Sequence, residues 1–140
     1  YNRKIFDDLG GFVKHTIFND HMIYAAGAIE AGYGVAYAAQ AKVYHSHDLG
    51  YMEQLHRNFD LGVSQAQHPE IFDAYPSESE GLRYVRQLIR HLNGAGLKRK
   101  IPHLILQSGF KYIGYWCGKH YGRLPRRLVI AMSSSKEYWK

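Results

Sequence analysis

The sequence predicts an α/β fold in its first half, followed by a mainly α-helical and basic second half. Apolar residues recur at helical spacing in several segments. Two short segments between them, residues 35–37 and 41–45, are rich in β-branched and aromatic side chains and predict strands. The hydrophobic content of 46% in 140 residues is enough for a buried core, which excludes a chain that is disordered throughout.

The first half is expected to run helix, helix, strand, strand. Residues 3–9 form a short helix that ends at Gly10 and Gly11. A second helix runs from Asn19 or Asp20, either of which can cap it, to residue 31, where Gly32 can take the left-handed closing conformation. A corner of small residues separates the two strands.

The second half is expected to be helical. Residues 51–67 and 82–92 each carry an amphipathic pattern, and a loop rich in Pro, Ser and Glu lies between them. Another helix begins near Pro102, and its apolar stretch is shorter than the ~20 residues that span a bilayer. We therefore expect three regions, namely residues 1–67, a linker at 68–80, and a basic helical region at 81–140.

Charge divides the chain in the same way. Residues 1–80 carry a net charge of −6 and residues 81–140 a net charge of +12, with Glu137 the only acid in the second part. Such a division indicates that the basic half faces phosphate, either of lipid or of nucleic acid. The single cysteine, Cys117, excludes an internal disulfide and favours a reducing cytoplasm.

Residues able to do chemistry gather between positions 18 and 47. The dipole of the second helix would favour the charged form of Asp20, which could then act as a base or a ligand, although helix starts also collect acids simply as caps. His45 and His47 are two residues apart on an extended segment, so they point to opposite faces. One of them is the more natural metal ligand, and the alternative is that both are surface residues.

These features lie in residues 1–12, 18–22 (FNDHM), 30–33 (EAGY), 35–37 (VAY) and 41–47 (AKVYHSH). Their order is similar to the C-terminal half of family 2 glycosyltransferases. The similarity extends more weakly through residues 59–63, 131–133 and 138–139, which resemble bacterial rhamnosyltransferases of surface-polysaccharide assembly.

The resemblance implies a GT-A type, Rossmann-like fold and an inverting transfer of a sugar from a nucleotide-activated donor, such as dTDP-rhamnose, to a saccharide or lipid-linked acceptor. It also implies a divalent cation, Mg²⁺ or Mn²⁺, bridging the donor diphosphate. The nucleotide-binding half of such enzymes carries an Asp-x-Asp motif, and no Asp-x-Asp occurs in these residues. We therefore expect the chain to be the C-terminal part of an enzyme and to be inactive by itself.

The resemblance also assigns roles to individual residues. An acidic pair at the helix start supplies the catalytic base in the family, and here it has become Asp20-His21, with His21 at the position of the catalytic aspartate. Asp20 and His21 are both candidates for the base, and an inactive homologue is a third possibility. Asn19 would contact the acceptor. His45 is the first choice as metal ligand and His47 the second.

The basic region allows three interpretations. Cationic and aromatic residues suit an anionic membrane surface, which would place the enzyme in the cytoplasm, peripherally bound to the inner face of the membrane. A helical subdomain packed on the catalytic part is the second interpretation, and nucleic-acid binding is the third, disfavoured by the acidic first half. The expected membrane contacts are Arg83, Arg86, Arg90, Lys111 and Trp116.

Overall fold

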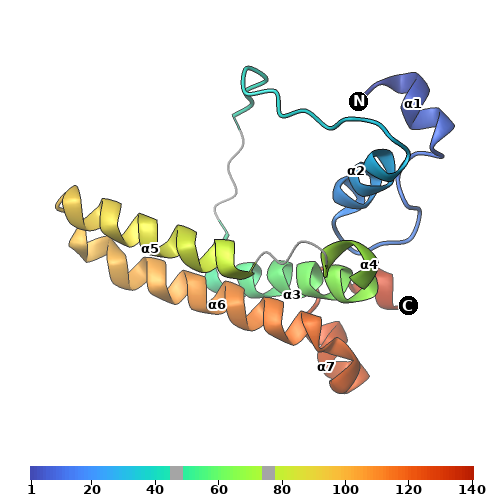
Figure 1. Cartoon of the computed structure of the whole chain (residues 1–140). Helices are drawn as coiled ribbons and strands as arrows, with labels where there is room; N and C mark the ends of the chain where they lie inside the picture. Colours follow the sequence, from blue (N-terminus) through green and yellow to red (C-terminus); the bar gives the residue numbers. More distant parts are fainter. Residues whose placement is uncertain (45–48, 74–77) are drawn as a thin grey trace. The chain divides into compact units, whose positions relative to one another are not determined.

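A computed structural model describes residues 1–44, 49–73 and 78–140 (Figure 1). The chain divides into two compact units, Tyr1–Asp48 (unit 1) and Leu49–Lys140 (unit 2). The expected regions divide the chain elsewhere, at residues 67 and 81. In the structure, the helix at residues 51–67, before the expected linker, packs against the helix at residues 101–119, after it. Both helices belong to unit 2.

The predicted α/β fold is wrong, because the described residues form helices and contain no strand. Residues 33–44, which include the first predicted strand and most of the second, run as irregular chain with only local hydrogen bonds, such as Lys42 N–H to the Gln40 carbonyl at 2.9 Å. An extended segment becomes a strand only when its backbone groups pair with a neighbour, and no neighbour is present among the described residues. Val35 and Tyr37, at 61% and 95% exposure, accordingly have no sheet to cover them.

Unit 1 contains the helices α1 (Arg3–Asp8) and α2 (Asp20–Glu30). The Asn2 side chain caps α1 by accepting the Ile5 N–H at 3.3 Å. Gly32 follows α2 with φ +86°, and Tyr33 N–H bonds to the Ala28 carbonyl at 2.9 Å. This pattern is a Schellman closure, so the predicted left-handed conformation of Gly32 is confirmed.

Aromatic rings hold α1 and α2 together in unit 1. Phe6 of α1 and Tyr24 of α2 lie 5.2 Å apart between ring centroids, and Phe12 lies 5.0 Å from Phe6 and 5.7 Å from Tyr24. Tyr1 completes the cluster at 5.4 Å from Tyr24. Tilted and edge-on contacts of this kind stabilise beyond their buried area, so the rings tie α1 to α2 although Tyr1 is 80% exposed.

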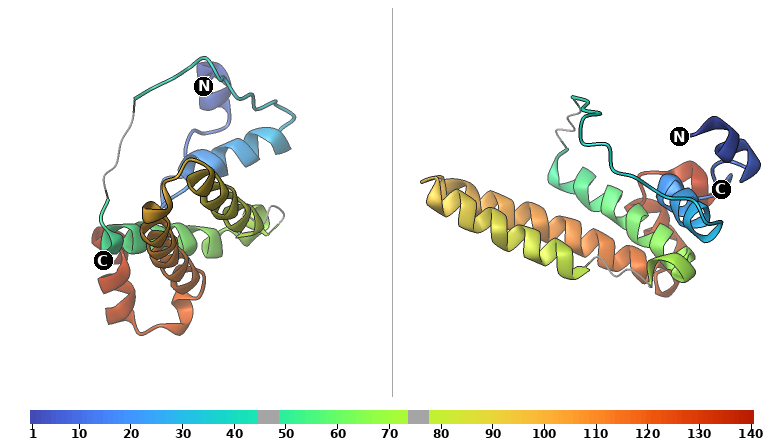
Figure 2. Two further views of the ribbon diagram at one scale, coloured as in Figure 1. Left: turned by 90° about the vertical axis from the view of Figure 1, so that its left-hand side faces the viewer. Right: turned by 45° about the horizontal axis from the view of Figure 1, so that its top comes forward.

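Unit 2 is built on the pair formed by α3 (Tyr51–Gln67) and α6 (Ile101–Lys119). The Gly50 N–H starts α3 by donating to Glu53 Oε2 at 2.8 Å. The long helix α5 (Glu78–Gly94) lies along α6, and the two are joined at one end by the turn η1 (Lys98–Lys100), as both views of Figure 2 show. The short helix α4 (Pro69–Phe72) follows α3 directly.

Glycines allow α3 and α6 to touch backbone to backbone. A Cβ atom at Gly118 would lie 2.1 Å from the Phe59 carbonyl oxygen, and one at Gly114 would lie 2.2 Å from the Leu55 carbonyl oxygen. On α3, a Cβ at Gly62 would lie 2.3 Å from the Tyr115 carbonyl oxygen. No side chain fits at these three positions, so the close crossing depends on glycine.

The C-terminal segment is fastened to α3 by polar side chains. It comprises η2 (Tyr121–Arg123), α7 (Arg126–Met132) and η3 (Lys136–Trp139). His56 Nδ1 lies 2.7 Å from the Met132 carbonyl oxygen, and one turn later Asp60 Oδ2 accepts the Ser134 N–H at 2.9 Å. These residues hold the chain where α7 ends, beside the fully buried Phe59 and Val63.

Candidate functional site

The chain turns sharply into α2 at Asn19. Asn19 has φ +62°, a left-handed conformation that asparagine tolerates better than most residues, and its carbonyl accepts the N–H groups of Met22 and Ile23. Just before it, the Thr16 hydroxyl donates to the Phe18 carbonyl at 2.7 Å. This turn places Asp20 and His21 in the first turn of α2, as the sequence predicted.

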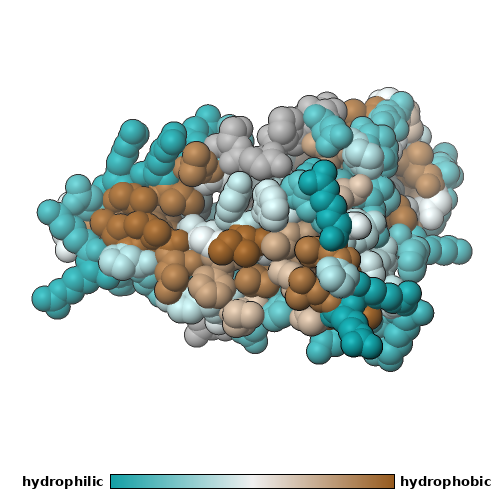
Figure 3. All heavy atoms as spheres, turned by 90° about the horizontal axis from the view of Figure 1, so that it is seen from below, coloured by the Kyte–Doolittle hydropathy of each residue, from teal (hydrophilic) through white to brown (hydrophobic). Residues whose placement is uncertain are grey.

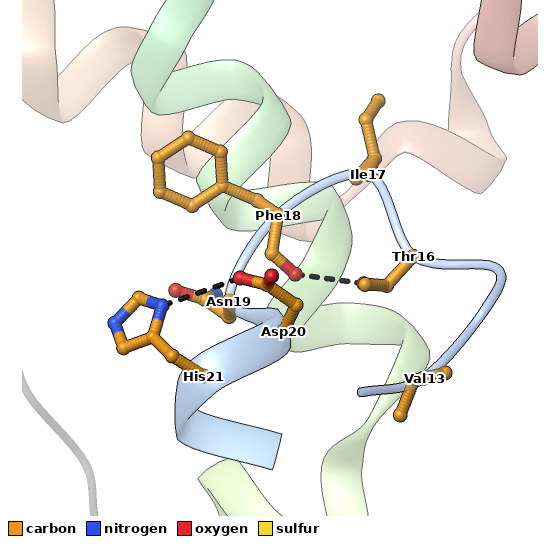
Figure 4. Close-up of a pocket in the computed structure, with 7 residues that line it drawn as sticks. All are labelled: Val13, Thr16, Ile17, Phe18, Asn19, Asp20 and His21. Carbon is orange, nitrogen blue, oxygen red and sulfur yellow. Dashed lines mark hydrogen bonds and ion pairs between the residues drawn. The ribbon is translucent and has the colours of Figure 1, made fainter. Parts of the chain in front are cut away.

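A solvent-open hollow of about 440 Å³ lies at this end of α2. Figure 4 shows the side chains around it, with Asp20 and His21 next to one another on the first turn of the helix. Both side chains are about half exposed, at 52% and 59%. The hollow is therefore accessible to a polar ligand. Its lining residues are Val13, Thr16, Ile17, Phe18, Asn19, Asp20 and His21.

The two catalytic candidates form a hydrogen-bonded pair. His21 Nδ1 lies 3.3 Å from Asp20 Oδ1, and Nδ1 donates this bond when it carries the proton. In that tautomer the lone pair of Nε2 remains available as a proton acceptor, and Asp20 Oδ2 remains available as well. The pair therefore offers two basic atoms, an imidazole nitrogen and a carboxylate oxygen, on one helix turn.

Asn19, the predicted acceptor contact, lies in the wall of the hollow but is only 3% exposed. Its carbonyl accepts the first hydrogen bonds of α2, from the N–H groups of Met22 and Ile23, so its backbone sets where the helix begins. A contact between its side chain and an acceptor stays a prediction.

The residues described do not by themselves fit a divalent cation. Within residues 1–44, 49–73 and 78–140, no three His, Cys, Asp or Glu side chains gather where they could hold a metal ion. Asp20 has one such neighbour, His21, and a Mg²⁺ or Mn²⁺ site needs more oxygen ligands than this pair offers. The predicted ligands His45 and His47 lie outside the described residues.

The structure separates the five predicted membrane contacts onto different faces. Arg83, Arg86 and Arg90 are exposed on α5, and Arg83 forms an ion pair with Glu80 at 2.5 Å. Trp116 is 53% exposed on α6, whereas Lys111 is half-buried and lies about 140° away around the same helix. Lys111 and Trp116 therefore cannot meet one flat surface together.

Two further features were missed from the sequence. Thr16 and Val13 line the hollow from a loop that has no periodic pattern, so only the fold could place them. Asp60 is 2% exposed, and burial raises the pKa of its carboxyl more than hydrogen bonds from Ser133, Ser134 and Ser135 lower it. Aspartate is seldom buried so fully, and its residue type alone does not indicate this position.

Two curated proteins match nearly the whole chain. The O-antigen chain rhamnosyltransferase WbaN of Salmonella anatum is 40% identical over 143 aligned residues, which cover 99% of this chain and 44% of that protein. The chain is a relative of the O-antigen chain rhamnosyltransferases. RfbN of Salmonella typhimurium strain LT2, also an O-antigen chain rhamnosyltransferase, is 41% identical with the same coverage. The predicted kinship with bacterial rhamnosyltransferases is thus confirmed.

This relative of the rhamnosyltransferases spans less than half the length of the two proteins it matches. No family model matches it, and no solved structure does. The relationship consequently rests on sequence identity along the entire chain.

Proposed function

We propose that this chain is part of a glycosyltransferase that transfers rhamnose from dTDP-rhamnose to a growing polysaccharide, with Asp20 and His21 as the proton-accepting group. The observation that carries the proposal is the identity of 40% with a rhamnosyltransferase over 99% of the chain. The accessible Asp20–His21 pair at the rim of the hollow supports the chemical role.

The reaction replaces one bond to the anomeric carbon by another. The acceptor hydroxyl oxygen forms a bond to that carbon while the bond to the diphosphate breaks and its electron pair leaves with the nucleotide. Asp20 or His21 takes the hydroxyl proton, because a neutral hydroxyl is a weak nucleophile. Attack from the side opposite the leaving group inverts the configuration.

The hydrogen bond between the two side chains favours a joint role. Asp20 Oδ1 can fix the imidazole by accepting from Nδ1, which leaves Nε2 to take the acceptor proton. In the second arrangement Asp20 Oδ2 takes the proton directly and His21 orients the carboxylate. Both arrangements require Asp20, and the carboxylate is the family's usual base.

In this proposal, binding of the donor and its cation and selection of the acceptor are functions of parts of the enzyme other than the described residues. Less than half of each relative's length is represented here, and the described residues do not form a cation site. A lipid-linked acceptor at the inner face of the membrane is part of the proposal. In the described part of the chain, no helix is both long and apolar enough to cross a bilayer.

The proposal is tested by incubating the whole protein with dTDP-rhamnose and a lipid-linked oligosaccharide and following the product by mass spectrometry. We expect a rhamnosylated product of inverted configuration, and no turnover by residues 1–140 alone. Absence of transfer from dTDP-rhamnose and from other nucleotide sugars by the whole protein would contradict the proposal and favour a transferase-derived scaffold.

A further inference from the structure

One face of α6 carries an apolar stripe that no described residue of unit 2 covers. Ile105, Tyr112 and Trp116 follow one another at intervals of seven and four residues, so they lie in one row along the helix. Leu106 and Ile113 form a parallel row beside it. These five side chains are between 49% and 62% exposed.

The stripe is distinct from the face that packs on α3. Gly114 and Gly118 lie against the backbone of α3, on the opposite side of α6. Gly109, in the middle of the stripe, has open space where its Cβ would be. The stripe is therefore a continuous outer surface, separate from the contact with α3.

Basic residues lie at one end of α6. Lys98, Arg99 and Lys100 are exposed in η1, the turn that leads into this helix at the tip of the hairpin formed by α5 and α6. Figure 3 views the molecule from below, and the half that contains the hairpin tip shows an apolar band bordered by hydrophilic side chains. Glu137 is the only acidic residue after position 80.

We infer that the α6 stripe and the η1 turn together form a docking surface for an anionic lipid bilayer. Aliphatic and aromatic side chains at the stripe enter the headgroup boundary, and the cationic turn attracts anionic headgroups; the two contributions add. This inference deepens the proposed location at the membrane and does not depend on the sugar-transfer chemistry.

Charge and apolar character together favour a bilayer over other occupants. A second copy packed in parallel on the stripe would bring like-charged turns together, which repel. A nucleic acid would take the charges but would leave Ile105, Leu106 and Ile113 without a role, because stacking on bases needs aromatic or guanidinium planes. An anionic bilayer offers both a negative surface and an apolar layer.

The test is co-sedimentation of the purified protein with vesicles in which about a third of the lipid is phosphatidylglycerol and the rest phosphatidylcholine. Binding should weaken at least about tenfold in the triple variant Lys98→Gln, Arg99→Gln, Lys100→Gln, and similarly in the double variant Ile105→Gln, Ile113→Gln.

Each variant has a matched control. The control for charge is the triple variant Lys4→Gln, Lys14→Gln, Lys42→Gln, which changes three exposed lysines of unit 1. The matched control for the apolar change is Met52→Gln, Leu128→Gln, both exposed in unit 2. Neither control should reduce binding.

Tryptophan fluorescence identifies the face that meets the lipid. Trp116 and Trp139 are the only tryptophans, so Trp139→Phe makes Trp116 the sole reporter. The indole N–H of Trp139 is buried without a hydrogen-bond partner, so this replacement removes no bond. Emission of Trp116 should shift to the blue on anionic vesicles and be quenched by brominated lipid.

Three results would overturn the inference. They are equal binding to phosphatidylcholine vesicles, unchanged binding in either hairpin variant, and preferred binding to duplex DNA with no loss in Ile105→Gln, Ile113→Gln. No sugar donor or acceptor is present in the assay. Failure of vesicle binding would therefore leave the transfer reaction untouched, and an inactive enzyme would leave vesicle binding untouched.

Discussion

Asp20 Oδ1 and His21 Nδ1 lie 3.3 Å apart on the first turn of α2. Side chains of adjacent residues in a helix usually point in different directions. Here a hydrogen bond joins them, so each side chain restricts the orientation of the other. When the imidazole carries its proton on Nδ1, that proton lies on this hydrogen bond, and Nε2 is left as a proton acceptor. The proposed proton transfer depends on this contact.

The backbone contact of α3 with α6 predicts a severe effect of a single methyl group. Gly118→Ala would place a Cβ 2.1 Å from the Phe59 carbonyl oxygen, and the helices must separate to admit it. We expect a loss of about 3 kcal/mol in the free energy of unfolding, measured by urea denaturation. Gly109→Ala in the same helix is the control. It meets open space and should stabilise by about 0.5–1 kcal/mol through helix propensity. Equal effects of the two variants would contradict the packing described for Gly118.

The buried carboxyl of Asp60 predicts a stability that falls as pH rises. Burial raises its pKa in the folded state above the ordinary value of 3.8, so the unfolded chain releases this proton at lower pH than the folded chain does. From about pH 4 upward, until the folded carboxyl is fully ionised, the unfolded state binds fewer protons, and increasing pH favours unfolding.

This contribution is isolated with Asp60→Asn, which keeps an acceptor oxygen for the Ser134 N–H and removes the charge. The free energy of unfolding of the original protein minus that of the variant should become smaller as pH rises through this window. Asp8→Asn, at an exposed carboxylate, is the control. A difference that does not vary with pH, or that grows with it, would show that Asp60 has no raised pKa.

Phe59 is expected to be the most sensitive apolar residue of unit 2. Its side chain is 0% exposed on α3, where its backbone also meets Gly118. Phe59→Ala should cost about 3–5 kcal/mol in the free energy of unfolding. Met52→Ala, on the same helix but 54% exposed, should cost much less. Thermal unfolding followed by circular dichroism measures both, and similar costs would mean that the core lies elsewhere.

The sequence predicts five of the helices, namely α1, α2, α3, α5 and α6, whereas the two strands that it also predicts are absent from the described residues. Helical spacing and terminal glycines predict α1, α2 and α3 because the signal is local, and the left-handed Gly32 closes α2 as expected. The segment at 35–37 has the composition of a strand, but a strand also needs a pairing partner, which local composition does not reveal.

Contacts between residues far apart in the chain could not be predicted from the sequence either. Nothing local to Gly114 and Gly118 indicates that they pack against α3. The burial of Asp60 depends on the segment after α7, which returns to α3 at Ser134. In the candidate site, the place of Asp20 at a helix start predicts its role, whereas His21 is a candidate only through the resemblance to glycosyltransferases. Thr16 and Val13 were missed because their loop follows no periodic pattern.

The most direct test of the account is the initial rate of rhamnose transfer by the whole protein carrying Asp20→Asn, His21→Ala or both. General base catalysis contributes about 10²–10⁴ in rate, so Asp20→Asn should lower kcat at least about a hundredfold with little change in KM. The double variant should be little slower than the slower single variant, since the two residues act as a unit. Glu30→Gln, exposed at the other end of α2, is the control and should keep the original rate. Wild-type kcat in both Asp20→Asn and His21→Ala, with circular dichroism unchanged, would contradict the account.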